Sequence, residues 1–176
     1  MSCPDAQARI RIREELGVTD DELLVGLVAR MDPIKDHPTF FRAAAIVSRA
    51  KSATRFVCVG GGSESYRESL LPIVEQLDLR EKVIWTGLRT DMPDVYNALD
   101  VNVLSSITEG CPNVVGEAMS CGLPCVVTDA GDAANLVGDS GFISPAGDHE
   151  ALAANLLSCF EADREHFEYS GVCDIR

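Results

Sequence analysis

The sequence predicts an α/β fold: a doubly wound, Rossmann-like three-layer α/β/α domain with a mainly parallel sheet of about six strands. Short apolar runs alternate along the chain with amphipathic segments of helical length, which is typical of βαβ units. Most of these runs are continuous rather than alternating with polar residues, as in strands buried on both faces. A length of 176 residues suits a single domain.

The first half of the chain provides three strands and three helices. An amphipathic segment at residues 5–16 predicts a helix, and residues 1–22 together form an opening helix and linker. Strands follow at residues 23–28, 55–59 and 82–85. Helices are expected at residues 37–52 and 64–77, where Asp36 with Pro38 and Ser63 with Glu64 provide start signals.

The second half repeats the alternation. Strands are expected at residues 101–104, 124–128 and 141–143. Helices are expected at residues 92–98, 113–120 and 148–162, with a turn near Ala133, and Pro112 precedes the second of these helices. The polar residues 163–176 form a tail to which we assign no role.

The charge of the chain excludes some classes of partner. Fifteen Lys and Arg against 28 Asp and Glu give a net charge of -13, which disfavours binding to nucleic acid or to an anionic membrane surface. Any cationic site must be local. Lys occurs only at positions 35, 51 and 82, so Lys35, in a polar loop near Arg30, is of interest.

The cysteine content favours neither disulfides nor a metal. Seven is an odd count, several cysteines lie within apolar runs, and paired CxxC or His clusters are absent from the sequence, so we expect no metal site. The sequence contains no apolar run of about 18 residues and no leader pattern, which favours a cytoplasmic setting. The cysteines are Cys3, Cys58, Cys111, Cys121, Cys125, Cys159 and Cys173.

The loops that follow the strands hold the residues of chemical interest. Between strand 101–104 and helix 113–120 the chain reads SSITEGCP, so a polar loop leads into a helix start that can bind an anion such as phosphate. Glu109 lies in this loop and Glu117 in the first turns of the helix, and carboxylates accept hydrogen bonds from sugar hydroxyls. A ligand could therefore lie between the two groups.

The spacing of Glu109 and Glu117 is weak support by itself. About one such pair is expected by chance, and Glu14 with Glu22 is a second one, which we interpret as solvated charges. The alternative for Glu117 is a favourable interaction with the helix dipole of about 0.3–1 kcal/mol, with Glu109 merely solvated.

Two further loops complete the predicted site. Arg30 and Lys35 follow the first strand and could neutralise a diphosphate, although either could instead pair with Asp32 or Asp36. The glycine run 60–62 follows the second strand, where Gly61 and Gly62 could let a ligand approach the backbone, and at least one of the run's glycines bends the chain. Because GxGxxG and GxxxxGK[ST] are absent, a dinucleotide oxidoreductase and a P-loop enzyme are disfavoured.

The order of these parts resembles the C-terminal, donor-binding half of a GT-B retaining glycosyltransferase of the GT4 family (glycosyltransferase group 1). The match covers nearly all of residues 16–160. It runs through LVGLVARMDPIKDH, FVCVGGGSE, KVIWTGLRTDMPDVYNALDVNVLSS, TEGCPNVVGEAMSCGLPCVVTDAG and GFISPAGDHEALAANL. Where the family often has a Gly-Gly and an acidic residue after the fifth strand, this chain has Gly131, Asp132, Ala133 and Asn135.

The resemblance implies a role for each site residue. Arg30 and Lys35 would contact the donor diphosphate, Glu109 would be the first Glu of the E-x7-E motif and face the transferred sugar, and Glu117 would hold the ribose. The backbone of the following segment would contact sugar and phosphate, and the turn at Leu88 and Arg89 would line the nucleobase. That segment consists of Gly110, Cys111, Pro112, Asn113 and Val114.

The resemblance also implies what the whole protein does. It predicts metal-independent, retaining transfer of a hexosyl group from a UDP-, GDP- or ADP-sugar to a carbohydrate or lipid-linked acceptor. The acceptor would be bound by an N-terminal domain that this chain lacks, so residues 1–176 alone would be inactive. The alternative is a non-catalytic nucleotide-binding or regulatory module on the same scaffold.

Overall fold

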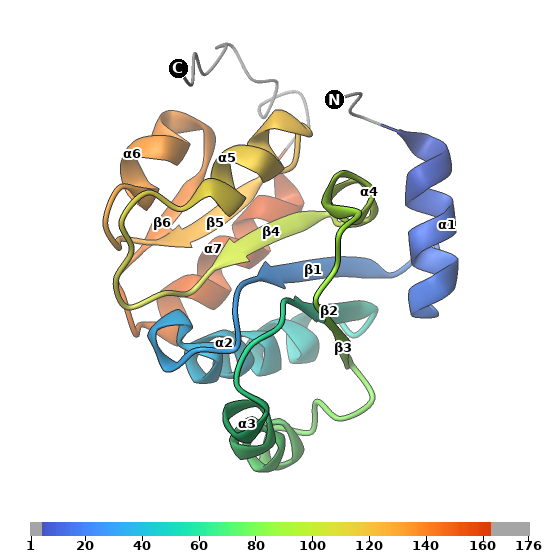
Figure 1. The fold of residues 1–176 in the computed structure, drawn as a ribbon, viewed down its shortest axis with the longest axis horizontal. Helices are drawn as coiled ribbons and strands as arrows, with labels where there is room; N and C mark the ends of the chain where they lie inside the picture. Colours follow the sequence, from blue (N-terminus) through green and yellow to red (C-terminus); the bar gives the residue numbers. More distant parts are fainter. Residues whose placement is uncertain (1–4, 163–176) are drawn as a thin grey trace.

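A computed structural model describes residues 5–162 as one six-stranded, all-parallel sheet with helices on both faces (Figure 1). The strand order is β3-β2-β1-β4-β5-β6. The strands are β1 (Leu23–Val28), β2 (Thr54–Val59), β3 (Val83–Gly87), β4 (Val101–Leu104), β5 (Cys125–Thr128) and β6 (Phe142–Ser144). The predicted fold class is confirmed.

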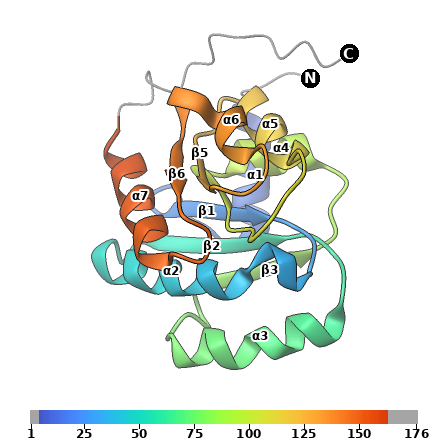
Figure 2. The same ribbon diagram turned by 90° about the vertical axis from the view of Figure 1, so that its left-hand side faces the viewer.

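The helices form two layers, which Figure 2 shows on opposite sides of the sheet. One face is covered by α2 (His37–Ala50), α3 (Glu64–Gln76) and α7 (His149–Glu161). The other is covered by α1 (Ala6–Leu16), α4 (Met92–Ala98), α5 (Asn113–Ser120) and α6 (Ala133–Val137). Each layer forms its own apolar core against the sheet, with Phe40 and Phe56 on the first face and Leu24 and Leu104 on the second.

The predicted elements are largely confirmed, with bounds that differ by at most two residues. The turn expected near Ala133 is the helix α6. Two 3-10 helices, η1 (Pro33–Lys35) and η2 (Gly138–Ser140), were not predicted, because three residues are too few for a periodic signal. The edge strands β3 and β6 are only partly buried, unlike the central four. The predicted tail, 163–176, lies outside the described residues.

Side-chain caps explain where most of the long helices begin. Asp36, Ser63 and Asp148 each accept a hydrogen bond from a backbone N–H in the first turn of the helix that follows. Helix α5 differs, since its N-cap residue is Pro112 and provides no side-chain hydrogen bond. The N–H of Val115 donates to the Pro112 oxygen at 3.0 Å, and no side chain caps the earlier N–H groups of Asn113 and Val114, which a ligand could therefore reach.

The linker before β1 corrects one expectation. Glu14 is exposed as predicted, but Glu22 is not a solvated charge. Its carboxylate accepts a 2.9 Å hydrogen bond from the N–H of Thr19 and pairs with Arg55 at 3.6 Å. Threonine three residues before glutamate is a local turn-capping pattern, and this spacing was the available signal.

The strand order places a switch in chain direction at the centre of the sheet. From β1 the chain moves outward to β2 and β3, and it then returns to β4 on the other side of β1. The strands β1 and β4 are neighbours, but the chain after β1 leads toward β2 and the chain after β4 leads toward β5. The two loops therefore separate from each other at the carboxyl end of the sheet. In open α/β sheets this crevice is where ligands bind.

Candidate functional site

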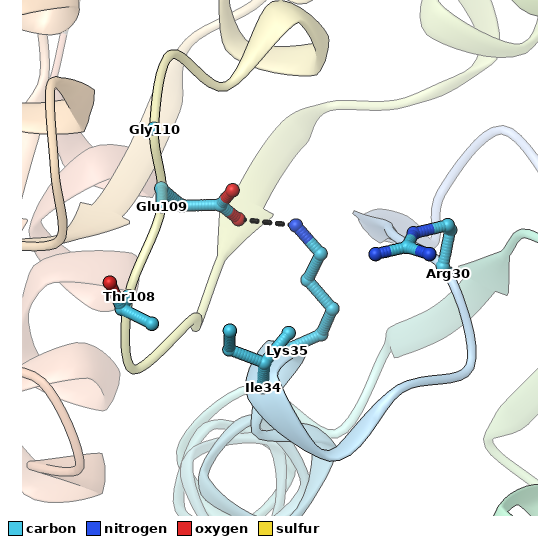
Figure 3. Close-up of a pocket in the computed structure, with 6 residues that line it drawn as sticks. All are labelled: Arg30, Ile34, Lys35, Thr108, Glu109 and Gly110. Carbon is cyan, nitrogen blue, oxygen red and sulfur yellow. Dashed lines mark hydrogen bonds and ion pairs between the residues drawn. The ribbon is translucent and has the colours of Figure 1, made fainter.

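The loops after β1 and β4 line a shallow, open pocket at this crevice. It has a volume of about 320 Å³, at the small end of the range for ligand pockets. Figure 3 shows its lining, which comes from the two loops alone. The lining residues are Arg30, Ile34, Lys35, Thr108, Glu109 and Gly110.

Local backbone geometry sets the position of Lys35. The Asp32 side chain accepts a 3.1 Å hydrogen bond from the N–H of Ile34, which starts the short helix η1 with Pro33 in its first turn. Lys35 is the last residue of η1. Asp36 then adopts a left-handed conformation with φ 47° and caps α2. The chain thus makes a tight turn that leaves the Lys35 side chain at the pocket.

Lys35 and Glu109 form an ion pair across the pocket (Figure 3). Nζ of Lys35 lies 2.5 Å from Oε1 of Glu109, and the two side chains are only 16% and 10% exposed. Low exposure weakens screening by water, so this pair is stronger than a surface pair. Two residues 74 positions apart in the sequence are brought into direct contact.

Backbone and hydroxyl contacts join the two loops beneath the ion pair. The hydroxyl of Ser105 donates to the backbone oxygen of Lys35 at 2.8 Å, and the N–H of Ile107 donates to the oxygen of Ile34 at 2.9 Å. Gly131, with φ 57°, lies against the Glu109 loop so closely that a Cβ there would be 2.1 Å from the Glu109 backbone oxygen. The loop after β5 therefore supports the loop after β4.

Arg30 lies at the pocket but is held loosely. Its side chain is 74% exposed and pairs with Asp32 at 3.4 Å, so one of the alternatives to ligand binding is present in this structure. Figure 3 shows Arg30 on the far side of Lys35 from Glu109. A surface pair of this kind contributes about 0–1 kcal/mol, so an anion could readily displace it.

The segment from Gly110 to Val114 enters helix α5. Gly110 lines the pocket, Cys111 and Asn113 are exposed, Pro112 is buried and Val114 is half-buried. The start of α5 follows Glu109 by four residues, and Gly110 between them lines the same pocket. Together with Lys35 they present backbone N–H groups, a cation and a carboxylate in one region.

Glu117 is not among the residues that line this pocket. It is exposed on α5, and its Oε2 accepts a 2.9 Å hydrogen bond from the hydroxyl of Tyr96. Burial, with this hydrogen bond, raises the pKa of Tyr96, so the hydroxyl remains a donor at neutral pH. The lining of the pocket therefore includes Arg30, Lys35 and Glu109, while Glu117 lies on α5 outside this lining and is hydrogen-bonded to Tyr96.

The glycine run mainly permits close packing of the β1 and β2 loops. A Cβ on Gly60 would lie 2.1 Å from the Ala29 oxygen, and one on Gly62 would lie 2.8 Å from the Met31 oxygen. Both glycines also have positive φ, 148° at Gly60 and 143° at Gly62, a backbone conformation that favours glycine. Gly61 has more room, and its nearest contact would be the Leu88 side chain at 3.4 Å.

The two side chains of the turn at residues 88–89 differ in exposure. Leu88 is 79% exposed beside Gly61. The Arg89 guanidinium binds the carboxylates of Glu15 and Asp91, and these hydrogen bonds lower the pKa of both acids. Arg89 is thus held by helix α1 and its own loop, so a ligand would meet Leu88 and the backbone rather than the Arg89 guanidinium.

Four pocket-region residues were missed by the sequence reasoning. Ile34 and Thr108 line the pocket, and the buried hydroxyls of Ser105 and Ser106 contact Lys35 and Glu109. The available signal was the pair of serines directly after an apolar strand, because a strand end at the crevice places polar groups beside the ligand.

Residues 5–162 offer neither a metal-binding cluster nor a membrane-spanning helix. They contain no group of three or more His, Cys, Asp or Glu side chains placed to hold a metal ion. They also contain no helix long and apolar enough to cross a membrane.

The sequence is similar to curated glycosyltransferases. The UDP-Gal:alpha-D-GlcNAc-diphosphoundecaprenol alpha-1,3-galactosyltransferase of Escherichia coli is 33% identical over 117 residues, covering 65% of this chain and 30% of that protein. The D-inositol 3-phosphate glycosyltransferase of Segniliparus rotundus is 31% identical over 156 residues, covering 85% of this chain and 35% of that protein. The chain thus spans about one third of the length of these relatives.

Solved structures agree with this similarity. Anabaena Alr3699/HepE in complex with UDP and glucose matches with a TM-score of 0.84 and 28% identity, over 93% of this chain and 45% of that one. The C-terminal domain of the glycosyl transferase group 1 family protein LpcC from Francisella tularensis has the same fold, with a TM-score of 0.81 at 20% identity. That match covers 94% of this chain and 88% of that one.

The family to which the chain belongs is shown by a match that covers most of its length. The family described as "Glycosyl transferases group 1" matches residues 22–162, which include every strand of the sheet and all the pocket residues. The chain therefore belongs to the glycosyl transferases group 1 family, with the Rossmann-like fold of GT-B glycosyltransferases.

Proposed function

We propose that this chain binds the nucleoside diphosphate sugar of a retaining, GT4-type glycosyltransferase, with Glu109 and Glu117 as an E-x7-E motif. The observation that carries the proposal is the Lys35–Glu109 pair in a pocket at the crevice of the sheet. A cation for phosphate and a carboxylate for sugar hydroxyls lie there side by side. The UDP and UDP-glucose complexes of the structural relative Alr3699/HepE favour a uridine donor.

The diphosphate would lie between Lys35, Arg30 and the start of α5. An ammonium group has three N–H donors, so Lys35 can keep its bond to Glu109 and still donate to phosphate oxygens. The same groups would stabilise the negative charge that develops on the departing nucleoside diphosphate. Because protein cations and helix N–H groups supply this stabilisation, the reaction as we propose it needs no metal.

The rest of the donor would extend to either side of the diphosphate. The sugar would face Glu109, the ribose would be held by Glu117 where Tyr96 orients it, and the base would lie near Leu88 and Gly61. Since the chain spans about one third of its curated relatives, we propose that the acceptor is bound by a part of the protein outside it. The chain alone should then show no transfer activity.

Calorimetry on the purified chain tests the diphosphate site. UDP, GDP and ADP are titrated first, each followed by its glucose derivative, to find the preferred pair. Lys35→Ala should weaken binding of the nucleoside diphosphate about tenfold, and Glu117→Ala should also weaken it, since each removes a charge-assisted hydrogen bond. Lys51→Ala is the control, because Lys51 forms an exposed 4.0 Å pair with Glu161 after α2. Equal affinity of all three variants and the wild type would reject the assignment.

A second measurement separates a transferase site from a simple nucleotide-binding module. The preference for the nucleotide sugar over the free nucleotide isolates the contribution of the sugar. In the proposed site Glu109→Ala removes this preference, because Glu109 faces the sugar. A nucleotide-binding module has no use for a carboxylate there and would show no such preference in the wild type.

A further inference from the structure

The two carboxylate oxygens of Glu109 have different surroundings. Oε1 accepts hydrogen bonds from two donors, Nζ of Lys35 at 2.5 Å and the hydroxyl of Ser106 at 2.6 Å. Within residues 5–162 no side chain or backbone group donates to Oε2. Figure 3 shows the second oxygen turned away from Lys35. One oxygen is thus engaged by the protein and the other is left for a ligand.

Ser106 is well placed to hold Oε1, because it is itself fixed. The residue is fully buried, and its backbone oxygen accepts a 2.7 Å hydrogen bond from the hydroxyl of Thr128 at the end of β5. A carboxylate is only an acceptor when ionised, so the proton of this bond belongs to the serine. The bond is charge-assisted and correspondingly strong.

We propose that Ser106 is a positioning residue that fixes the rotamer of Glu109 and so presents Oε2 to the transferred sugar. This inference rests on the proposed function. Lys35 alone could not fix the carboxylate, because its flexible four-carbon chain can follow Glu109 as it rotates. Ser106 has a short side chain in the buried first part of the loop after β4, so it restricts Glu109 to one orientation.

The test compares two neighbouring buried serines. Ser106 bonds to the Glu109 carboxylate, whereas Ser105 bonds to the Lys35 backbone, and both are fully buried. Affinities for UDP and UDP-glucose are measured by calorimetry, or for the GDP or ADP pair if that pair binds best. Ser106→Ala should reduce the preference for the nucleotide sugar about tenfold and leave UDP binding nearly unchanged. Ser105→Ala should affect the two ligands equally, since it acts through Lys35.

A double-mutant cycle distinguishes positioning from a general structural role. If Ser106 acts only through Glu109, Ser106→Ala should have no further effect on the preference in a Glu109→Ala background. A structural defect would lower both affinities and would persist in that background, which would overturn the inference. A Ser106→Ala variant with the wild-type preference would overturn it as well. A wild-type chain that binds none of the nucleotides would instead overturn the proposed function itself.

Discussion

At the scale of single residues, His37 is a buried base that the proposed function does not use. It follows the Lys35 turn directly, is fully buried, and packs edge-on against Tyr66 with ring centres 5.5 Å apart. Neither ring nitrogen has a hydrogen-bond partner among the described residues. Burial lowers the pKa of His37 from 6.5 to about 4, so the folded chain keeps this imidazole neutral.

This pKa predicts a pH dependence of stability. Between pH 6.5 and 4 the unfolded chain binds a proton at His37 and the folded chain does not, so stability falls as the pH falls. The loss should reach about 3 kcal/mol at pH 4 relative to pH 7. Urea unfolding of the wild type and of His37→Phe at several pH values measures it, since the variant lacks this contribution.

Carboxylates also titrate in this pH range. The contribution of His37 is therefore the difference between wild type and variant in how steeply the unfolding free energy changes with pH. His149→Gln, at the start of α7 and only partly buried, is the control. A His37→Phe variant whose stability falls as steeply with acid as the wild type would show that His37 is not the cause.

At the scale of elements, Gly131 connects the end of β5 to the Glu109 loop. Its φ of 57° favours glycine, and a Cβ at this position would lie only 2.1 Å from the Glu109 backbone oxygen, so there is no room for a side chain. Gly131→Ala should therefore displace the Glu109 loop. We expect a loss of about 3 kcal/mol in unfolding free energy and a reduced preference for UDP-glucose over UDP.

Gly122 provides a matched control for this substitution. It has a similar φ of 69° after α5, but no atom lies within 4 Å of a Cβ built there. Gly122→Ala should cost about 1 kcal/mol, the left-handed strain alone, and leave the preference unchanged. Equal losses of stability and preference in the two alanine variants would contradict a special role for Gly131.

The sequence predicted features that depend on residues close together in the chain better than contacts between residues far apart in it. Strands β1 and β4 were predicted with the observed bounds, because burial on both faces produces mostly apolar runs, of which only the Asn102 position in β4 is polar. The start of α2 was predicted from Asp36, which is a local cap. By contrast, the partner of Lys35 lies 74 residues away, and the sequence left Asp32, Asp36 and a ligand as alternatives.

Local patterns also left open which partners two other charged residues would have. Glu117 lies at the predicted position on α5, and its carboxylate accepts a hydrogen bond from Tyr96 of α4, a partner 21 positions away. Arg89 lies in the turn predicted to line the nucleobase, and its guanidinium binds the carboxylates of Glu15 and Asp91. Which acid meets which base depends on packing between elements distant in sequence, and no spacing rule encodes that.

At the scale of the whole molecule, the two central strands carry charged contacts at both ends. At the carboxyl end, the loops after β1 and β4 are joined by Lys35 and Glu109. At the amino end, Asp100 precedes β4 and accepts a 2.8 Å hydrogen bond from the N–H of Leu24 in β1. Asp100 also binds Arg13 of α1 at 3.2 Å, in a fully buried setting. One pair faces the ligand site, and the other ties a helix to the sheet.

This arrangement predicts that stability and ligand binding can be altered separately. Arg13 also donates to the backbone oxygens of Ala98, Thr19 and Glu22, so Arg13→Ala would leave these oxygens without that donor, although Asp100 would keep its 2.8 Å pair with Arg9. We expect a loss of about 3–5 kcal/mol, or a fall in Tm of about 10 °C, because the lost partner is buried. The preference for UDP-glucose over UDP should not change.

Arg11→Ala is the control on the same helix, since Arg11 pairs with Asp94 on the surface and is 59% exposed. Its loss should lower the unfolding free energy by less than about 1 kcal/mol. Lys35→Ala should show the reverse of Arg13→Ala, with a large loss of UDP binding and a smaller fall in Tm. Thermal unfolding and calorimetry on the three variants measure both quantities. If Arg13→Ala altered the ligand preference as strongly as the stability, the two ends of the central strands would be coupled, contrary to this prediction.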